Sequence, residues 1–203
     1  MPDRGYFITV EGVDGSGTTT VSTALATRVD GGLLTQEPTD GWTGQYVREA
    51  ITRGGVDNAF VDFYLFLADR AYHVEDCIIP AVRAGNLVVS DRYADSTRAY
   101  QTISLAAAGI PASHVASYIE QAMGPILYTP DITLWLDADV DTTFQRLDRS
   151  EKFEEEIEFQ RQVNDQYRVL YETTDRIHRI DANQEIHHVI GDAVNTIESE
   201  LDL

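Results

Sequence analysis

The sequence predicts an α/β fold in which a central parallel sheet of about five strands is flanked by helices. Five short apolar runs alternate with longer segments whose apolar residues recur every three or four positions. Glycine-rich or polar residues directly follow these runs, as expected where parallel strands end at one edge of a sheet. No repeat or linker interrupts the alternation, so residues 1–203 are expected to form a single domain.

The runs that we expect to form strands are too short for helices. In chain order they are residues 6–10, 33–36, 87–91, 132–137 and 176–181. Runs 87–91 and 132–137 are almost continuously apolar, which predicts that both faces of these strands are buried. Pro38 stops the second run, because proline cannot continue a ladder of strand hydrogen bonds.

Helices are expected between these runs. The segments are 21–29, 45–53, 58–83, 96–108, 112–123, 141–149, a helix that follows the charged stretch 148–158 and reaches residue 171, and 185–201. Residues 41–44 are typical of a turn. The pattern is clearest in 58–83, which Gly85 and Asn86 are expected to cap, while Gly109 and Pro111 end the segment before 112–123.

The charge balance excludes one class of function. The chain has 34 acidic and 15 basic residues, a formal net charge of −19, and Lys152 as its one lysine. Such a surface repels the nucleic-acid backbone, so a nucleic-acid-binding module is not expected. In about 1 M salt the Debye length falls to about 3 Å, which would let an anionic nucleotide approach. A halophilic source is therefore our hypothesis.

Other features of the sequence predict a cytoplasmic protein without a membrane partner. No run approaches the roughly 18 uninterrupted apolar residues that span a bilayer, and no room is left for a signal peptide before the first run. The single cysteine, Cys77, cannot form an internal disulfide and is expected to be a small buried apolar residue.

Residues 12–20, Gly-Val-Asp-Gly-Ser-Gly-Thr-Thr-Thr, are expected to cradle phosphates. Glycines let backbone N–H groups turn inward, and the following helix N-terminus adds positive potential. The pattern departs from a complete phosphate-binding loop at Thr18, where that loop has lysine, whereas Thr19 keeps the hydroxyl that reaches Mg²⁺. An ordinary glycine-rich turn is the alternative. The residues predicted to bind ATP here are Gly12, Gly15, Ser16, Gly17, Thr18, Thr19 and Thr20.

In their order and spacing, several segments resemble the thymidylate kinase family, which transfers the γ-phosphate of ATP to dTMP. They are residues 11–17, Glu37-Pro38, Phe-Leu-Ala-Asp-Arg at 66–70, residues 91–101, residues 130–137 and Asp181-Ala182. The resemblance extends over about residues 6–201. It implies a three-layer P-loop kinase fold with a short lid at about 146–156, ATP and Mg²⁺ as cofactors, and a homodimer.

The resemblance also implies roles in binding dTMP. Asp14 would accept from the 3′-hydroxyl, Phe66 would stack on thymine, and Arg70 would hold the monophosphate. Phe66 and Arg70 are four residues apart, so they share one helix face. Thr97 and Gln101 would meet the base edge, and Tyr100 would crowd the sugar 2′-position, although a core aromatic is the alternative for Tyr100. The complete expected set is Asp14, Glu37, Pro38, Phe66, Arg70, Arg92, Thr97, Tyr100 and Gln101.

The residues expected at the transferring phosphate also follow from the resemblance. Arg92 would contact the acceptor phosphate and the transferring group, and Asp91 would lie near Mg²⁺ with Thr19. Gly15 stands where some members carry a loop arginine, so Arg149, and next Arg146, of the lid would contact the transition state. Surface charges are the alternative for these two. The expected catalytic residues are Asp14, Arg92, Arg149 and Arg146, and Asp181 and Ala182 would border the adenine.

Two departures from the family pattern remove positive charge. Thr18 replaces the loop lysine, and Gln36 stands where the family usually has an arginine at the acceptor phosphate. Positioning and charge neutralisation supply most of the catalysis of phosphoryl transfer, so losing the lysine should be costly. A lid residue or neighbouring cation could replace it, the chain could be a weak kinase, or it could bind nucleotide without catalysis. A kinase for another deoxynucleotide or nucleoside is a further alternative. We favour an active kinase, because Asp14, Arg70 and Arg92 are retained.

Overall fold

The computed structural model describes residues 4–28, 32–52, 58–145 and 153–201. In this part of the chain, five parallel strands form one sheet in the order β2-β3-β1-β4-β5. Their bounds are β1 Phe7–Gly12, β2 Leu33–Gln36, β3 Val88–Asp91, β4 Ile132–Asp137 and β5 Ile177–Asp181. The predicted parallel sheet of five strands is confirmed, and each predicted strand agrees with an observed one to within two residues.

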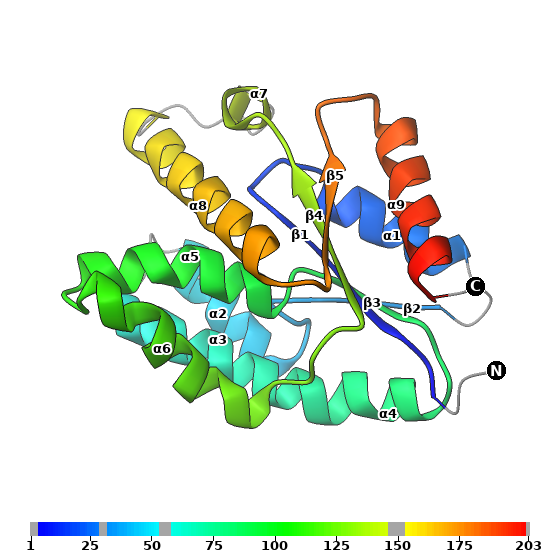
Figure 1. Cartoon of the computed structure of the whole chain (residues 1–203). Coiled ribbons are helices and arrows are strands. Elements are labelled where there is room, and N and C mark those ends of the chain that lie inside the picture. The colour runs from blue at the N-terminus through cyan, green and yellow to red at the C-terminus, as the bar shows by residue number, and fades with distance from the viewer. Residues whose placement is uncertain (1–3, 29–31, 53–57, 146–152, 202–203) are drawn as a thin grey trace.

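Helices cover both faces of this sheet. Their bounds are α1 Thr18–Arg28, α2 Trp42–Thr52, α3 Ala59–His73, α4 Ile79–Arg83, α5 Ala94–Ala107, α6 Ala112–Met123, α7 Val140–Gln145, α8 Phe153–Thr173 and α9 Ile186–Leu201. Helices α1 and α9 lie on one side, and α3, α5, α6 and α8 lie on the other (Figure 1). The fold therefore has three layers. None of the described helices is long and apolar enough to cross a membrane.

Side chains of β1 show why both faces are covered. Ile8 and Val10 pack against α1 and α9, and Phe7 packs against the opposite layer. Successive side chains of a strand alternate between faces, so Thr9 and Glu11 point to the same side as Phe7. Both polar residues are completely buried there. This layer of the protein therefore contains charged groups as well as apolar core.

The helix predicted at residues 58–83 is interrupted. A π-helical turn, η1 Val74–Ile78, separates α3 from α4, and the N–H of Ile79 bonds to the carbonyl of Val74, five residues back. Pro80 explains the interruption, because proline lacks the N–H that an α-helix needs and its ring crowds the preceding turn.

The turn predicted at residues 41–44 is also wrong in part, because α2 already begins at Trp42. Gly44 lies in its first turn, where a Cβ would come within 1.9 Å of the Thr39 carbonyl oxygen. Glycine is therefore needed for close packing and not to break the helix. The residue types at positions 41–44 do not show whether a glycine forms a turn or allows close packing inside a helix.

Candidate active site

A cavity of about 840 Å³ lies at the carboxyl edge of the sheet, between the loop after β1 and helices α3, α5 and α8. Many predicted site residues line it, namely Asp14, Gly15, Gly17, Thr18, Thr19, Thr20, Glu37, Pro38, Phe66, Arg70, Arg92, Thr97, Tyr100 and Gln101. Ile51, Asp62, Tyr93, Ser96, Ser104 and Phe159 complete the lining. The sheet thus gathers segments that lie far apart in the sequence around one hollow.

The glycine-rich loop between β1 and α1 borders this cavity. Gly15 and Gly17 have φ angles of 79° and 100°, in the left-handed region that glycine adopts without strain. Gly12 is close to Ser16, and a Cβ on Gly12 would lie 2.6 Å from the Ser16 Oγ. The loop ends at Thr18, the first residue of α1, so the free N–H groups of a helix terminus face the region of Thr18–Thr20.

Arg92 and Asp14 connect the ends of β3 and β1. The Arg92 Nη2 donates to the Asp14 Oδ1 at 2.9 Å, and its Nη1 donates to the Gly12 carbonyl at 2.8 Å. The Tyr100 hydroxyl donates to the same Asp14 oxygen at 3.1 Å. From α8, the Gln160 side chain donates to the Asp14 Oδ2 at 3.2 Å. Asp14 is therefore held by three separate elements.

A second group of charges lies where β2 ends. The Arg70 Nη2 donates to the Glu37 Oε2 at 2.5 Å and to the Thr97 Oγ1 at 2.9 Å. The Arg70 Nε and the Gln101 Oε1 are buried and have no hydrogen-bond partner among the described residues. Both residues line the cavity. A buried donor and a buried acceptor thus lie unpartnered in residues of the cavity wall.

Thr19, which lines the cavity, meets Asp91, which ends β3 and does not line the cavity. The Thr19 hydroxyl donates to the Asp91 Oδ2 at 2.5 Å, and the Asp91 Oδ1 is buried without a partner in the described chain. A hydroxyl and a carboxylate oxygen are ligands that suit Mg²⁺, which usually keeps several waters and binds substrate phosphates. The donor set therefore fits Mg²⁺, although no group of three acidic, histidine or cysteine side chains in the described residues is arranged to hold a metal ion.

The chain is similar to known thymidylate kinases over almost its whole length. The family model described as thymidylate kinase matches residues 10–192. The chain belongs to the thymidylate kinase family. A "Probable thymidylate kinase" of Halorubrum lacusprofundi is 38% identical over 194 residues, covering 96% of this chain and 98% of the relative. One of Halobacterium salinarum is 40% identical over 188 residues, covering 92% of each chain.

Solved structures agree with this assignment. The thymidylate kinase of Ehrlichia chaffeensis superposes with a TM-score of 0.76 at 28% identity, covering 95% of this chain and 98% of that one. The thymidylate kinase of Candida albicans has a TM-score of 0.82, covering 97% and 92%, and its 23% identity supports the fold alone. The predicted P-loop kinase fold is confirmed.

Some expected site residues of this thymidylate kinase family member do not line the cavity. Ala182 is buried in the core beside α9, and the Asp181 carboxylate accepts from the backbone N–H of Asn183 at 3.0 Å. Gly12 and Ser16 support the loop from behind it. The predicted lid arginines, Arg146 and Arg149, lie outside the described residues.

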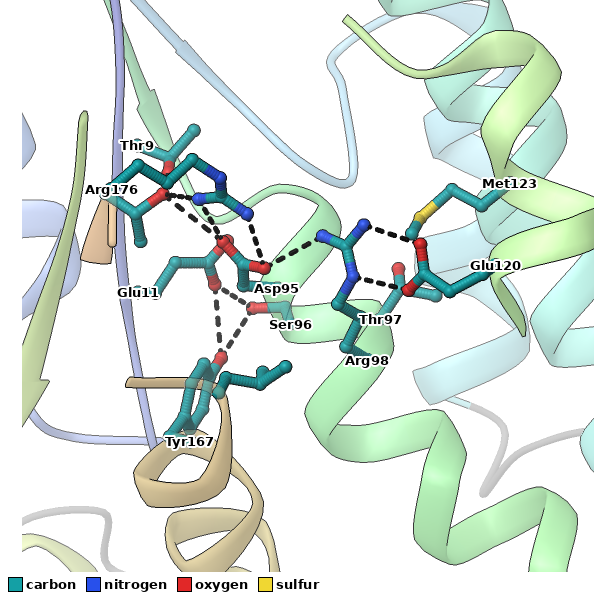
Figure 2. Close-up of polar contacts among 12 residues, drawn as sticks. Thr9, Glu11, Asp95, Ser96, Thr97, Arg98, Glu120, Met123, Tyr167 and Arg176 are labelled. Atoms are coloured by element: carbon teal, nitrogen blue, oxygen red, sulfur yellow. Dashed lines mark hydrogen bonds and ion pairs between the residues drawn. The ribbon is translucent and has the colours of Figure 1, made fainter. Parts of the chain in front are cut away.

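Sequence reasoning missed a buried polar cluster behind Arg92. The Glu11 Oε2 accepts from the Ser96 hydroxyl at 2.5 Å and from the Tyr167 hydroxyl at 3.1 Å (Figure 2). The Arg92 Nη1 also donates to the Ser96 Oγ at 3.3 Å. Burial, together with the nearby Asp95 carboxylate, raises the pKa of Glu11 to about 7. The alternation of β1, which places Thr9 and Glu11 on one face, was the available signal.

Asp95 shows how a second buried carboxylate of this cluster stays charged. Arg176 donates from both of its terminal nitrogens to Asp95, and the Arg98 Nη1 donates to it at 2.8 Å (Figure 2). Burial alone would raise the pKa of Asp95, but these two arginines outweigh it and lower the pKa. Neither arginine was a predicted site residue. Their role is to hold α5, which carries Thr97, Tyr100 and Gln101, against the end of the sheet.

Proposed function

We propose that this protein transfers the γ-phosphate of ATP to dTMP, giving dTDP, with Mg²⁺ bound between Thr19, Asp91 and the phosphates. One observation carries the proposal: a single cavity is bordered by a phosphate-binding loop and by an aromatic, an arginine and an amide from α3 and α5. Both nucleotides can therefore meet end to end over the sheet, which is the arrangement that phosphoryl transfer needs. Family membership supports the same reaction.

The acceptor end suits a thymine nucleotide. Phe66 offers an apolar face to the base, and the unpartnered Oε1 of Gln101 can accept from the thymine N3–H. Cytosine has no hydrogen on N3, so a cytosine base placed in the same way offers this oxygen no donor at that position. An unpaired buried polar group discriminates strongly between ligands, which favours dTMP over dCMP. Arg70 lines the cavity and its buried Nε has no partner in the described chain, so Arg70 is our candidate for binding the monophosphate.

Thr18 does not rule out catalysis. Its side chain is buried to 93% and lines the cavity, and its hydroxyl makes no hydrogen bond with the described chain. Arg92 lines the same cavity, and its guanidinium is held in place by Asp14 and by the Gly12 carbonyl. We infer that Arg92, with the predicted lid arginines Arg146 and Arg149, supplies part of the positive charge that the loop lacks.

We also propose a homodimer formed through α3 and α6. Tyr64 is half exposed, and a shallow hollow beside it is lined by Asn58, Phe60, Val61 and Leu65. The Tyr64 hydroxyl lies 2.5 Å from that of Tyr118 on α6, so one apolar surface spans both helices. Light scattering of the protein and of Tyr64→Arg would test it, since a charge at this surface should yield monomers.

A halophilic cytoplasm is the proposed setting. The net charge of −19 supports it, as do the relatives from halophilic archaea. Assays are therefore designed for 2 to 3 M KCl, where repulsion between the protein and ATP is largely screened.

The deciding experiment is a coupled assay with ATP, Mg²⁺ and a panel of acceptors that includes dTMP, dUMP, dCMP, dGMP and thymidine. We expect dTMP to give the highest kcat/KM, with dCMP at least tenfold lower. A higher kcat/KM with another acceptor would make the protein a different nucleotide kinase. Nucleotide binding without turnover, with turnover restored in Thr18→Lys, would mean that catalysis has been lost.

A further inference from the structure

We propose that His73 is a positioning residue, which shares the Glu37 carboxylate with Arg70 and so leaves positive charge of Arg70 available to the acceptor phosphate. The inference rests on the proposed function, because it assigns Arg70 to the monophosphate of the acceptor. His73 belongs to no motif of the sequence analysis and does not line the cavity. It acts from behind Glu37.

The three side chains form one buried row. The His73 Nδ1 donates to the Glu37 Oε1 at 3.0 Å, and the Arg70 Nη2 donates to the other oxygen, Oε2, at 2.5 Å. Each of the three side chains is 3% exposed or less. The His73 Nε2 lies 2.7 Å from the Thr35 hydroxyl on β2. Both ring nitrogens therefore have an oxygen in reach, an arrangement that suits the doubly protonated, charged ring.

The charge of His73 depends on groups from several elements. Burial lowers the pKa of His73, but hydrogen bonds with Cys77 and Glu37 outweigh it and raise the pKa to about 9. Cys77 comes from the π-helical turn, and its thiol pKa is lowered by the same histidine. Arg70 approaches Glu37 from α3, and the ring of Tyr93, before α5, lies 6.4 Å from the His73 ring.

The charge of His73 decides how much net positive charge the acceptor end offers to a ligand. With a neutral His73, Glu37 and Arg70 would cancel, and the acceptor end would present an internally neutral pair. With a charged His73, the three groups carry one net positive charge in a dry region, where electrostatic interactions are strong. The Arg70 Nε is buried without a partner, and Arg70 faces the cavity. A phosphate bound there would meet the positive charge of Arg70, which Glu37 neutralises only in part because it also pairs with His73.

The residue before Glu37 offers no charge to a phosphate. Gln36 is neutral, does not line the cavity, and its amide donates to the Asp40 Oδ1 at 3.1 Å. Beside Glu37, the positive charge therefore comes from Arg70 and from His73 behind it.

The test compares binding of dTMP with binding of thymidine, which lacks the phosphate, by calorimetry in 2.5 M KCl. The variant His73→Gln keeps an amide donor for Glu37 but carries no charge. We expect its Kd for dTMP to rise about tenfold and its Kd for thymidine to change less than twofold. In the coupled assay, KM for dTMP should rise more than kcat falls.

The pH profile separates His73 from Cys77. In the parent protein, affinity for dTMP should fall as the pH rises through about 9, where His73 loses its proton. This fall should be absent in His73→Gln, whereas in Cys77→Ser it should remain but occur at lower pH, because Cys77 helps to raise the pKa of His73. As a second measurement, Glu37→Gln should shrink the effect of His73→Gln in a double-mutant cycle, because no carboxylate is left to share. If His73→Gln folds poorly, the pH profile of the parent still tests the proposal, because a dTMP affinity that does not change through about pH 9 would overturn it.

Each outcome decides a different point. Equal affinities of parent and His73→Gln for dTMP, or an equal loss for dTMP and thymidine, would overturn the role of His73. Binding of dTMP with the expected difference but no phosphate transfer would overturn the proposed function alone. A parent protein that binds neither dTMP nor thymidine would overturn both.

Discussion

Arg92 and Asp14 form an ion pair that spans two strand ends, with the Arg92 Nη2 2.9 Å from the Asp14 Oδ1. Arg92 has a φ angle of 67°, a left-handed conformation that costs a non-glycine residue roughly 1–3 kcal/mol. Its hydrogen bonds to Asp14 and to the Gly12 carbonyl offset this strain. The chain's own groups therefore fix the position of the guanidinium, and a charge fixed in this way stabilises a transition state without reorganisation.

Asp14→Asn should lower kcat/KM for dTMP at least 30-fold. The substitution removes the charge that pairs with Arg92 and weakens the bond from Tyr100 to the same oxygen. Breaking a buried, hydrogen-bonded charge pair typically costs about 2–5 kcal/mol, and the low end of this range applies here because the two side chains are 20% and 30% exposed. Steady-state kinetics at varied concentrations of dTMP would measure kcat/KM. Asp165→Asn, which breaks an exposed pair with Arg168, is the matched control and should change kcat/KM less than twofold. Similar values for the two variants would contradict a role for Asp14 at the site.

Thr18→Lys should raise kcat at least tenfold. Thr18 lines the cavity at the start of α1, so a lysine there can reach the β- and γ-phosphates of ATP. Thr27→Lys adds the same charge on an exposed position near the other end of α1 and should leave kcat unchanged. Initial rates at saturating ATP and dTMP would compare the three proteins. A kcat of Thr18→Lys no higher than that of the parent would show that another cation already fills this role.

Salt should stabilise the folded protein. The formal net charge of −19 sets like charges close together in the compact state, and about 1 M salt reduces the Debye length to about 3 Å. We expect the urea midpoint of unfolding to rise steadily between 0.2 and 3 M KCl, followed by circular dichroism. Choline chloride at equal concentration would separate screening from binding of the potassium ion. A midpoint that is independent of KCl would contradict the halophilic hypothesis.

The parts of the fold that sequence reasoning predicted are those with a local signal. Runs such as 132–137 are too short and too apolar for anything but a buried strand. Parallel strands end at one edge of the sheet, so the residues that follow them were predicted to bind the ligand there. This rule placed Asp14 and Arg92 together. The strand order, with β1 between β3 and β4, depends on packing among distant helices and has no local signal.

Gln160 and His73, which sequence reasoning also missed, lack a local signal for the same reason. Gln160 reaches Asp14 across 146 positions of the chain, and in sequence it is one polar residue on an amphipathic helix. His73 gives no sign of its contact with Glu37, because that contact depends on how α3 crosses the end of β2. Side chains that hold other side chains in place are fixed by tertiary packing, and a single sequence records only their types.

The pKa of Glu11, raised to about 7 by burial and by Asp95, predicts a pH-dependent stability. The ordinary value of 4.5 describes Glu11 in the unfolded chain, so the folded state binds its proton more tightly between these two values. This group therefore favours folding at low pH, and its contribution is lost as the pH rises from about 4.5 to about 7. One pKa unit corresponds to about 1.4 kcal/mol, so the full effect is about 3 kcal/mol.

Replacing Glu11 with glutamine should remove this dependence, because the amide does not ionise and keeps an oxygen for Ser96 and Tyr167. We expect the free energy of unfolding of Glu11→Gln, relative to the parent, to rise by about 3 kcal/mol between pH 5 and pH 8. Urea unfolding in 2.5 M KCl at each pH would measure it. Glu158→Gln, at an exposed glutamate of α8, is the control and should follow the parent. A parallel pH profile of Glu11→Gln and the parent would mean that Glu11 is charged in the folded protein, with its charge balanced by Arg92 through Ser96.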